Sequence, residues 1–283
     1  MFILPFNHEI KTTMNIINRN NVRVYGKGAK TIVFAHGYGC DQSMWRRVSP
    51  SFEDEYKVVL FDYVGSGLSD TDVYDPLRYS SLAGYAKDIV EICTALDLQD
   101  AILVGHSVSS MISLLAAIEI PHRISTLIMI CPTPRYLNDL PDYIGGFEQA
   151  DIEGLLDTID RNQPGWAAHL AGIVVNDPDQ AELAQELEVS FCAMDPAIAK
   201  RFAKATFLAD NRSDLVGFDK PCLILQCQED LVAPNVVGDY LHQHLPNSHL
   251  QQMKATGHSP HMSHPLETIE LIKKYLASNV KQN

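Results

Sequence analysis

Short apolar runs rich in β-branched residues alternate with helical patterns along most of the chain. Nearly continuous apolar runs are typical of strands that are buried on both faces of a parallel sheet. We expect such strands at residues 31–35, 57–61, 101–104, 126–130 and 222–226, with a weaker one at 250–254. Residues 82–96 instead carry apolar side chains at helical spacing. This alternation predicts an α/β fold with a mostly parallel, doubly wound sheet.

The alternation stops in the middle of the chain. Helical patterns at 151–161, 165–175, 180–192 and 195–209 follow one another with no strand between them, separated by turn signals that contain Asn, Asp and Pro. The strand pattern resumes after Lys220-Pro221. We therefore expect a core of residues 1–131 and 216–283, with residues 132–215 inserted as a helical cap. Open α/β sheets bind ligands at the carboxyl ends of their strands, so the cap is expected to cover that edge.

Composition and charge narrow the class of protein. Of 283 residues, 46% are hydrophobic and 20% charged, a balance typical of soluble globular proteins. The net charge of −13 disfavours binding to nucleic acid or to anionic membranes. No apolar run approaches the roughly 20 residues that a membrane span needs. Six cysteines without a CxxC pair predict reduced thiols in a cytoplasmic protein. The N-terminus does not resemble a secretion signal, and Met14 is an alternative start that would leave the first residues as a surface tail.

A candidate nucleophile lies between an expected strand and an expected helix. In Gly105-His106-Ser107-Val108-Ser109, a tight turn would project Ser107 from the sheet edge. The usual pattern is G-x-S-x-G, and Ser109 departs from it at the last position, which predicts slightly different packing of the turn. Taken alone, the motif also fits an ordinary polar loop.

A serine hydroxyl needs a base, and the base needs a carboxylate to orient it. Asp230 follows the expected strand at 222–226, and His258 follows the one at 250–254. Three loops at one sheet edge can converge, so these residues complete a candidate Ser-Asp-His triad. Glu229 remains the alternative acid.

The glycine-rich stretch His36-Gly37-Tyr38-Gly39 follows the first long strand. Glycines let a backbone N–H group turn toward a developing oxyanion. We expect the amides of Tyr38 and Val108 to form the oxyanion hole, the second of them at the start of a helix, whose dipole favours negative charge.

Together these motifs resemble the α/β-hydrolase family. The stretches AHGYGCDQSMW, FDYVGSGLSD, GHSVS and ILQCQEDLVAP resemble the RsbQ-like bacterial stress-response hydrolases, which are similar to the plant karrikin and strigolactone receptors. The resemblance implies a V-shaped, four-helix cap over an apolar pocket, and catalytic roles for Ser107, Asp230 and His258. It also implies a signalling role together with a partner protein phosphatase that contains a PAS domain.

Other sites are weaker. His258, His261 and His264 are spaced by three, but no HExxH motif is present and prolines interrupt the segment, so we expect no metal. No G-x-G-x-x-G follows a strand, so we expect no cofactor. The cap aromatics have a competing interpretation as helix packing; Phe147, Trp166 and Phe207 are the candidates for lining the pocket.

The expected function is a serine hydrolase that acts on a small hydrophobic ester, lactone or related carbonyl compound. Two alternatives remain open. One is a ligand receptor with slow or vestigial hydrolysis, and the other is a hydrolase of C–C bonds that uses the same triad.

Overall fold

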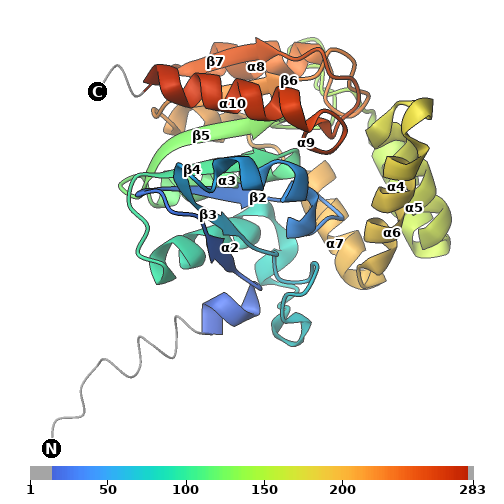
Figure 1. Cartoon of the computed structure of the whole chain (residues 1–283). Helices are drawn as coiled ribbons and strands as arrows, with labels where there is room; N and C mark the ends of the chain where they lie inside the picture. Colours follow the sequence, from blue (N-terminus) through green and yellow to red (C-terminus); the bar gives the residue numbers. More distant parts are fainter. Residues whose placement is uncertain (1–14, 280–283) are drawn as a thin grey trace, which may run out of the picture.

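The structure is a computed structural model that describes residues 15–279 (Figure 1). Within that range it contains a seven-stranded sheet in the order β1-β3-β2-β4-β5-β6-β7. The strands are β1 (Arg23–Tyr25), β2 (Lys30–Ala35), β3 (Tyr56–Leu60), β4 (Ala101–His106), β5 (Ile124–Ile130), β6 (Cys222–Gln226) and β7 (Ser248–Gln252). Strand β1 runs antiparallel to β3, and the other neighbours are parallel. The mostly parallel, doubly wound sheet is therefore confirmed.

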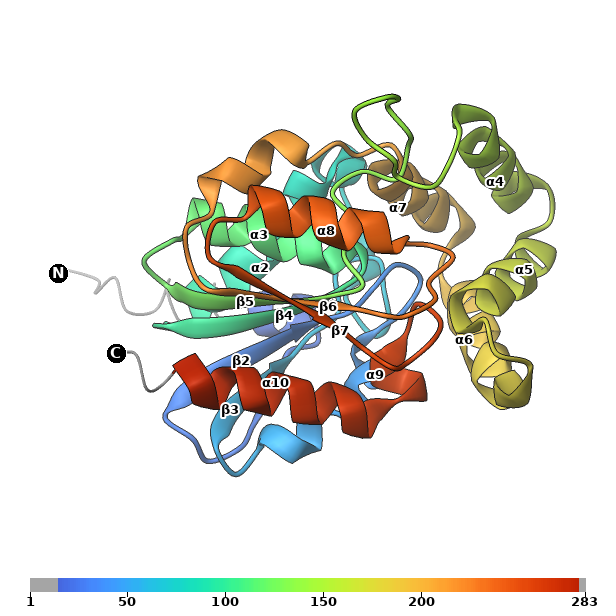
Figure 2. The same cartoon turned by 90° about the horizontal axis from the view of Figure 1, so that it is seen from above.

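The central strands are apolar because both of their faces are covered. Every residue of β4 is buried. The helices of the core include α2 (Leu82–Ala95), α3 (Val108–Glu119), α8 (Asn235–His244), α9 (Pro260–Ser263) and α10 (Pro265–Asn279). Seen from above, α2, α3 and α8 lie on one side of the sheet and α10 on the other (Figure 2). Five of the expected strands agree closely with β2 to β6. The weaker strand expected at residues 250–254 corresponds to β7, which begins and ends two residues earlier.

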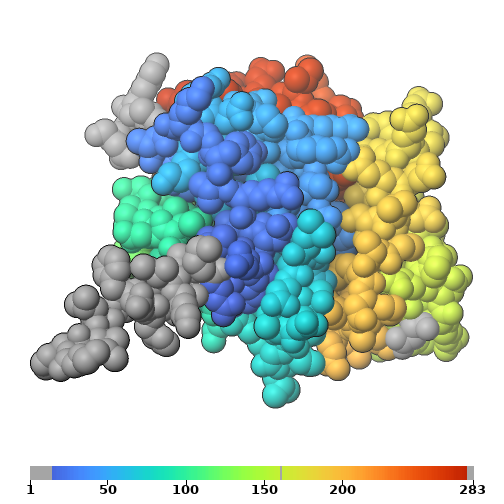
Figure 3. Space-filling view, turned by 60° about the horizontal axis from the view of Figure 1, so that its bottom comes forward, coloured from blue at the N-terminus to red at the C-terminus, as the bar shows by residue number. Residues whose placement is uncertain are grey.

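The helical block in the middle of the chain is also present. It consists of α4 (Gln149–Arg161), α5 (Gln163–Val175), α6 (Ala181–Ala193) and α7 (Pro196–Phe207). Helix α5 packs against α6, and α4 against α7. The four helices lie beyond one end of the strands (Figure 2). In the space-filling view, the yellow and orange surface of the later cap helices adjoins the blue surface of the core (Figure 3). The domain boundaries at residues 132 and 215 stay predictions.

The two ends of this insertion are fastened to each other. Arg135 and Asp210 form an isolated backbone bridge, and a guanidinium nitrogen of Arg135 lies 2.5 Å from a carboxylate oxygen of Asp210. Arg212 pairs with the same carboxylate at 2.7 Å and with Asp139 at 2.8 Å. The chain therefore leaves and re-enters the core at one point.

Two further predictions, on membrane spans and on cysteines, can be compared with the structure. Among the described residues, no helix combines the length and the apolar character that crossing a bilayer requires. All six cysteines are free thiols; Cys192 is exposed and the others are buried. The N-terminal tail before the alternative start lies outside the described residues.

Candidate active site

The carboxyl ends of neighbouring parallel strands bring together three loops that are distant in sequence. Ser107 directly follows β4, Asp230 lies in the loop after β6, and His258 lies in the loop after β7. Each strand pairs with its neighbour in parallel register, so all three loops leave the sheet at the same edge. The topology thereby gathers the three candidate triad residues.

The turn that carries Ser107 is tight and strained. Ser107 has φ 55° and ψ −125°, which places an L-residue in a rarely occupied backbone region. A Cβ atom at Gly105 would lie 2.3 Å from the carbonyl oxygen of Ser109, so strand and helix can approach this closely only with glycine there. The Ser110 hydroxyl donates to the Gly105 carbonyl at 2.9 Å and fastens the turn. The turn therefore forms although Ser109 replaces the usual glycine.

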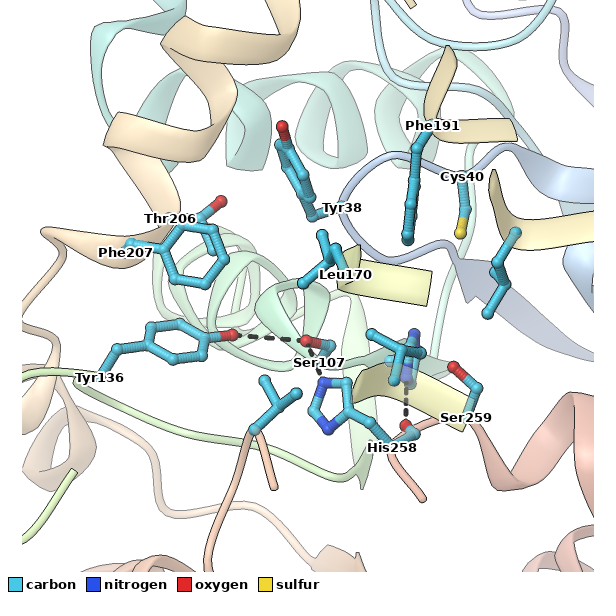
Figure 4. A pocket seen from close by; sticks show the side chains of 14 residues that line it. Tyr38, Cys40, Ser107, Tyr136, Leu170, Phe191, Thr206, Phe207, His258 and Ser259 are labelled. Atoms are coloured by element: carbon cyan, nitrogen blue, oxygen red, sulfur yellow. Dashed lines mark hydrogen bonds between the residues drawn. The ribbon is translucent and has the colours of Figure 1, made fainter. Parts of the chain in front are cut away.

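Ser107, His258 and Asp230 form one hydrogen-bonded chain. Ser107 Oγ lies 2.7 Å from Nε2 of His258 (Figure 4). Nδ1 of the same ring lies 2.8 Å from Oδ2 of Asp230. All three residues are buried. Because an ionised carboxylate only accepts hydrogen bonds, Nδ1 carries the ring proton and Nε2 is left to accept the proton of Ser107. This is the geometry that general-base activation of a serine requires.

The surroundings of Asp230 keep its carboxyl group ionised. Burial alone would raise its pKa, but His258 and the amides of Ala233 and Val232 outweigh this effect, so the pKa of Asp230 is lowered. Those amides donate to Oδ1 at 3.0 and 2.8 Å. The side chain of the alternative acid, Glu229, is exposed and makes no hydrogen bond to the histidine among the described residues. The geometry therefore favours Asp230.

His106 supports the loop that carries His258. Its Nε2 lies 2.8 Å from the carbonyl oxygen of His258, so Nε2 must carry the proton and donate. Burial, followed by the proximity of His258, lowers the pKa of His106 to about 3, so the ring is neutral. These contacts make His106 a packed residue that supports the sheet edge.

The candidate oxyanion donors belong to two different segments of the chain. Val108 is the first residue of α3, and Tyr38 lies in the loop after β2 and lines the same cavity as Ser107. The Tyr38 hydroxyl donates to the carbonyl of Ala199 in α7 at 3.0 Å, which ties this loop to the cap. A second tie joins the Ser190 hydroxyl of α6 to the carbonyl of Gly39 at 2.8 Å.

A cavity of about 40 Å³ opens above Ser107, between the sheet edge and the helices α5, α6 and α7. It is lined by Tyr38, Cys40, His106, Ser107, Tyr136, Leu170, Val174, Leu187, Phe191, Thr206, Phe207, Val232, His258 and Ser259 (Figure 4). Arginine, lysine, aspartate and glutamate are absent from this lining, which suits an uncharged, mostly apolar ligand.

Of the three aromatic residues expected to line the pocket, Phe207 does so. Phe147 and Trp166 do not belong to the wall described above, which corrects the expectation for both. Trp166 lies on the same face of α5 as Leu170, but the rings of Tyr38 and Phe191 cover it, with centroids 5.9 and 5.8 Å away. Phe147 packs behind Tyr136, with the ring centroids 6.3 Å apart.

Tyr136 lines the cavity although it is not one of the three aromatic residues expected there. Its hydroxyl lies 3.3 Å from Ser107 Oγ, and burial raises its pKa, so it is protonated. Because Ser107 donates to His258, the Tyr136 hydroxyl is the donor in this contact. No local pattern around Tyr136 signals this position, because the path of the long loop after β5 determines it.

One cluster of candidate metal ligands is found among the described residues, and its chemistry disfavours a metal ion. Cys131, Asp230 and His258 have donor atoms within 4.8 Å of one another. However, Asp230 and His258 already bind each other, and burial raises the pKa of the Cys131 thiol well above its usual range. A thiolate, the form that binds metal, is therefore disfavoured there.

Comparison with known proteins agrees with this architecture. The family model described as the alpha/beta hydrolase fold matches residues 30–265. Karrikin insensitive 2 receptor CA of Petunia hybrida is 37% identical over 262 residues, which are 92% of this chain and 97% of the relative. Strigolactone esterase D14 of Arabidopsis thaliana is 35% identical, over 93% of this chain and 98% of its own. The solved structure of a hydrolase from Oleispira antarctica superposes with a TM-score of 0.92 at 45% identity, covering 94% of this chain and 97% of the other. The chain belongs to the alpha/beta hydrolase fold family.

Proposed function

We propose that the protein is a serine hydrolase that cleaves a small, uncharged ester, lactone or related carbonyl compound. The observation that carries this proposal is the unbroken chain of hydrogen bonds from Ser107 through His258 to Asp230, at the floor of an apolar cavity. A buried serine on a strained turn, with a base at 2.7 Å, is poorly explained by packing alone.

The reaction follows from the positions of these atoms. His258 Nε2 removes the Ser107 proton while Oγ attacks the carbonyl carbon, and the ionised Asp230 stabilises the imidazolium that forms. The amides of Tyr38 and Val108 bind the negative oxygen of the tetrahedral intermediate. The imidazolium then protonates the leaving alcohol. A water molecule, activated by the same base, releases the acyl group from Ser107.

The lining of the cavity supports this class of substrate. Its wall is mainly aliphatic and aromatic, and Ser107, Tyr136 and His258 form one hydrogen-bonded polar group within it. A substrate would therefore place its carbonyl group at the floor and an apolar body beneath the cap helices. The enzyme is proposed to work in the cytoplasm, where unbridged cysteines such as those found here are usual.

Turnover of a panel of small esters and butenolide lactones tests the proposal, with Ser107→Ala as the control. We expect hydrolysis by the native protein and a loss of at least about 10³-fold in the variant. Equal rates for the two proteins would contradict the proposal.

A second candidate function is that of a ligand receptor whose slow hydrolysis moves the cap. It is supported by the relatives named as karrikin receptors and as strigolactone esterases. In its RsbQ-like form, the moved cap would engage a phosphatase that contains a PAS domain. Intact-protein mass during the same reactions separates the candidates, because a fragment retained on the active site favours the receptor and fast turnover without an adduct favours the metabolic enzyme.

A further inference from the structure

Ser109, which replaces the usual glycine two residues after the nucleophile, makes hydrogen bonds that have no role in the reaction proposed above. Ser109 is completely buried near the start of α3. Its hydroxyl donates to the main-chain carbonyl of His36 in the oxyanion loop, and it also lies 3.0 Å from the hydroxyl of Tyr63. A hydroxyl has one proton, and a carbonyl can only accept. Ser109 therefore donates to His36, and Tyr63 donates to Ser109.

The same tyrosine fixes the ring of His36. The backbone N–H of Tyr63 donates to Nε2 of His36 at 3.2 Å. Nε2 is thus an acceptor, so Nδ1 carries the proton and donates to the carbonyl of Gly37 at 2.9 Å. Burial lowers the pKa of His36, which keeps the ring neutral and this tautomer in place. Tyr63, His36 and Ser109 together hold two successive carbonyl groups of the oxyanion loop.

Holding the Gly37 carbonyl determines where the next amide points. In a trans peptide, the N–H group points away from the carbonyl of the preceding residue. The direction of the Gly37 carbonyl therefore sets the direction of the Tyr38 N–H, which is the first donor of the proposed oxyanion hole. The second donor is the amide of Val108, the residue directly before Ser109.

We propose that Ser109 is a positioning residue that fixes the distance between the two halves of the oxyanion hole. Its main chain belongs to the helix that supplies the Val108 amide, and its hydroxyl holds the loop that supplies the Tyr38 amide. A glycine at this position has no hydroxyl and leaves this link unmade. Ser109 is absent from the cavity wall, so it acts on the transition state through the two amides and not on the bound substrate. The inference rests on the proposed function, because it assumes that Ser107 forms a tetrahedral intermediate.

The test uses the rate at which a fluorophosphonate labels Ser107, together with kcat and KM for the best ester of the panel. Labelling requires the nucleophile and the oxyanion hole but no turnover. Ser109→Ala is expected to slow labelling and to lower kcat about 10- to 100-fold, because misplacing one oxyanion donor costs less than deleting it. KM should stay within about twofold, since the wall is unchanged.

Ser113→Ala is the matched control. Ser113 is a buried serine of the same helix whose hydroxyl has no hydrogen-bond partner among the described residues. This variant should label and turn over like the native protein. Tyr63→Phe should slow labelling about two- to fivefold, because Ser109 then loses the donor that orients its hydroxyl. In the Ser109→Ala background, Tyr63→Phe should add nothing, since it acts through Ser109.

The outcomes separate the inference from the proposed function. If the native protein is labelled and folded Ser109→Ala is labelled as fast, the positioning role is wrong and the hydrolase stands. If the native protein is neither labelled nor active, the hydrolase itself is wrong. If Ser109→Ala does not fold, Tyr63→Phe decides, and labelling at the native rate overturns the inference.

Discussion

His261 is a fully buried histidine whose replacement should change the pH dependence of folding. Neither ring nitrogen has a hydrogen-bond partner among the described residues. The ring lies against Trp45 and His106, with centroids 4.6 and 4.3 Å away. Burial, followed by the nearby His106 and His258, lowers its pKa well below the usual value. The residue is therefore neutral in the folded protein, and His261→Phe would keep an aromatic ring at this position without a titrating group.

The magnitude follows from proton linkage. The unfolded chain binds a proton at this position below about pH 6.5, while the folded protein does not. The free energy of unfolding is therefore undiminished above pH 6.5 and falls as the pH drops below it, by about 1.4 kcal/mol per pH unit. Integrated from pH 7.5, the loss due to His261 is at most about 1.4 kcal/mol at pH 5.5 and at most about 2.7 kcal/mol at pH 4.5, limits that are reached when the folded ring stays neutral. The phenylalanine variant should avoid this loss.

Urea unfolding of both proteins at pH 7.5, 5.5 and 4.5 measures the effect. At pH 7.5 the variant should be as stable as the native protein or more so, because it no longer buries two unpaired nitrogens. Relative to the native protein, it should gain stability as the pH falls, by up to about 1.4 kcal/mol at pH 5.5. His122→Gln, at an exposed histidine, should leave the native pH dependence in place. Parallel stability curves for native protein and His261→Phe would refute the reasoning.

Three further predictions concern the triad and the cap. Asp230→Asn should lower kcat about 10⁴-fold, since the imidazole loses its orienting carboxylate, while Glu229→Gln should stay within about twofold in the same kinetic assay; a large loss in the glutamine variant would reassign the acid. Tyr136→Phe should lower kcat about two- to fivefold by removing a donor 3.3 Å from Ser107 Oγ, and an unchanged kcat would show that the contact does not matter. Arg212 and Arg135 lower the pKa of Asp210 to about 2, so this carboxylate stabilises the fold above about pH 4 and loses that effect as the pH falls toward 2. Asp210→Asn should lower the melting temperature at pH 7 by up to about 3 °C in low salt, and a drop that persists in 1 M salt would argue against an ionic origin.

The sequence predicts most of the sheet because its central strands are buried on both faces, which leaves a continuous apolar run. Strand β1 cannot be predicted in this way, because its three residues are mostly exposed and form no apolar run. The edge strand β7 is half-exposed for the same reason, and its expected position is off by two residues. The sequence also predicts that Ser107, Asp230 and His258 lie close together. Each of them follows a strand, and the carboxyl ends of parallel strands lie at one edge of the sheet.

The residues of the cavity wall are harder to predict from the sequence, because they depend on how the cap helices pack against one another. Helix α5 is apolar nearly all round, so its sequence does not say which face is covered. Trp166 lies on the correct face but one turn away from the cavity. Ser109 illustrates another limit. Its departure from the usual motif is visible in the sequence, but its partners, His36 and Tyr63, are brought to it only by the packing of β2, β3 and α3.

The small volume of the cavity has a consequence for the timing of the reaction. One water molecule needs roughly 10–15 Å³ of such space, so about 40 Å³ admits only a few atoms. A larger substrate enters only when α5, α6 or α7 moves outward. The same helices hold Tyr38 and Gly39 through Ala199 and Ser190, so an outward movement also disturbs the loop with the first oxyanion donor. If the proposed hydrolysis takes place, substrate entry and bond cleavage would occur in different conformations, and the frequency of opening would set the upper limit on the rate of turnover.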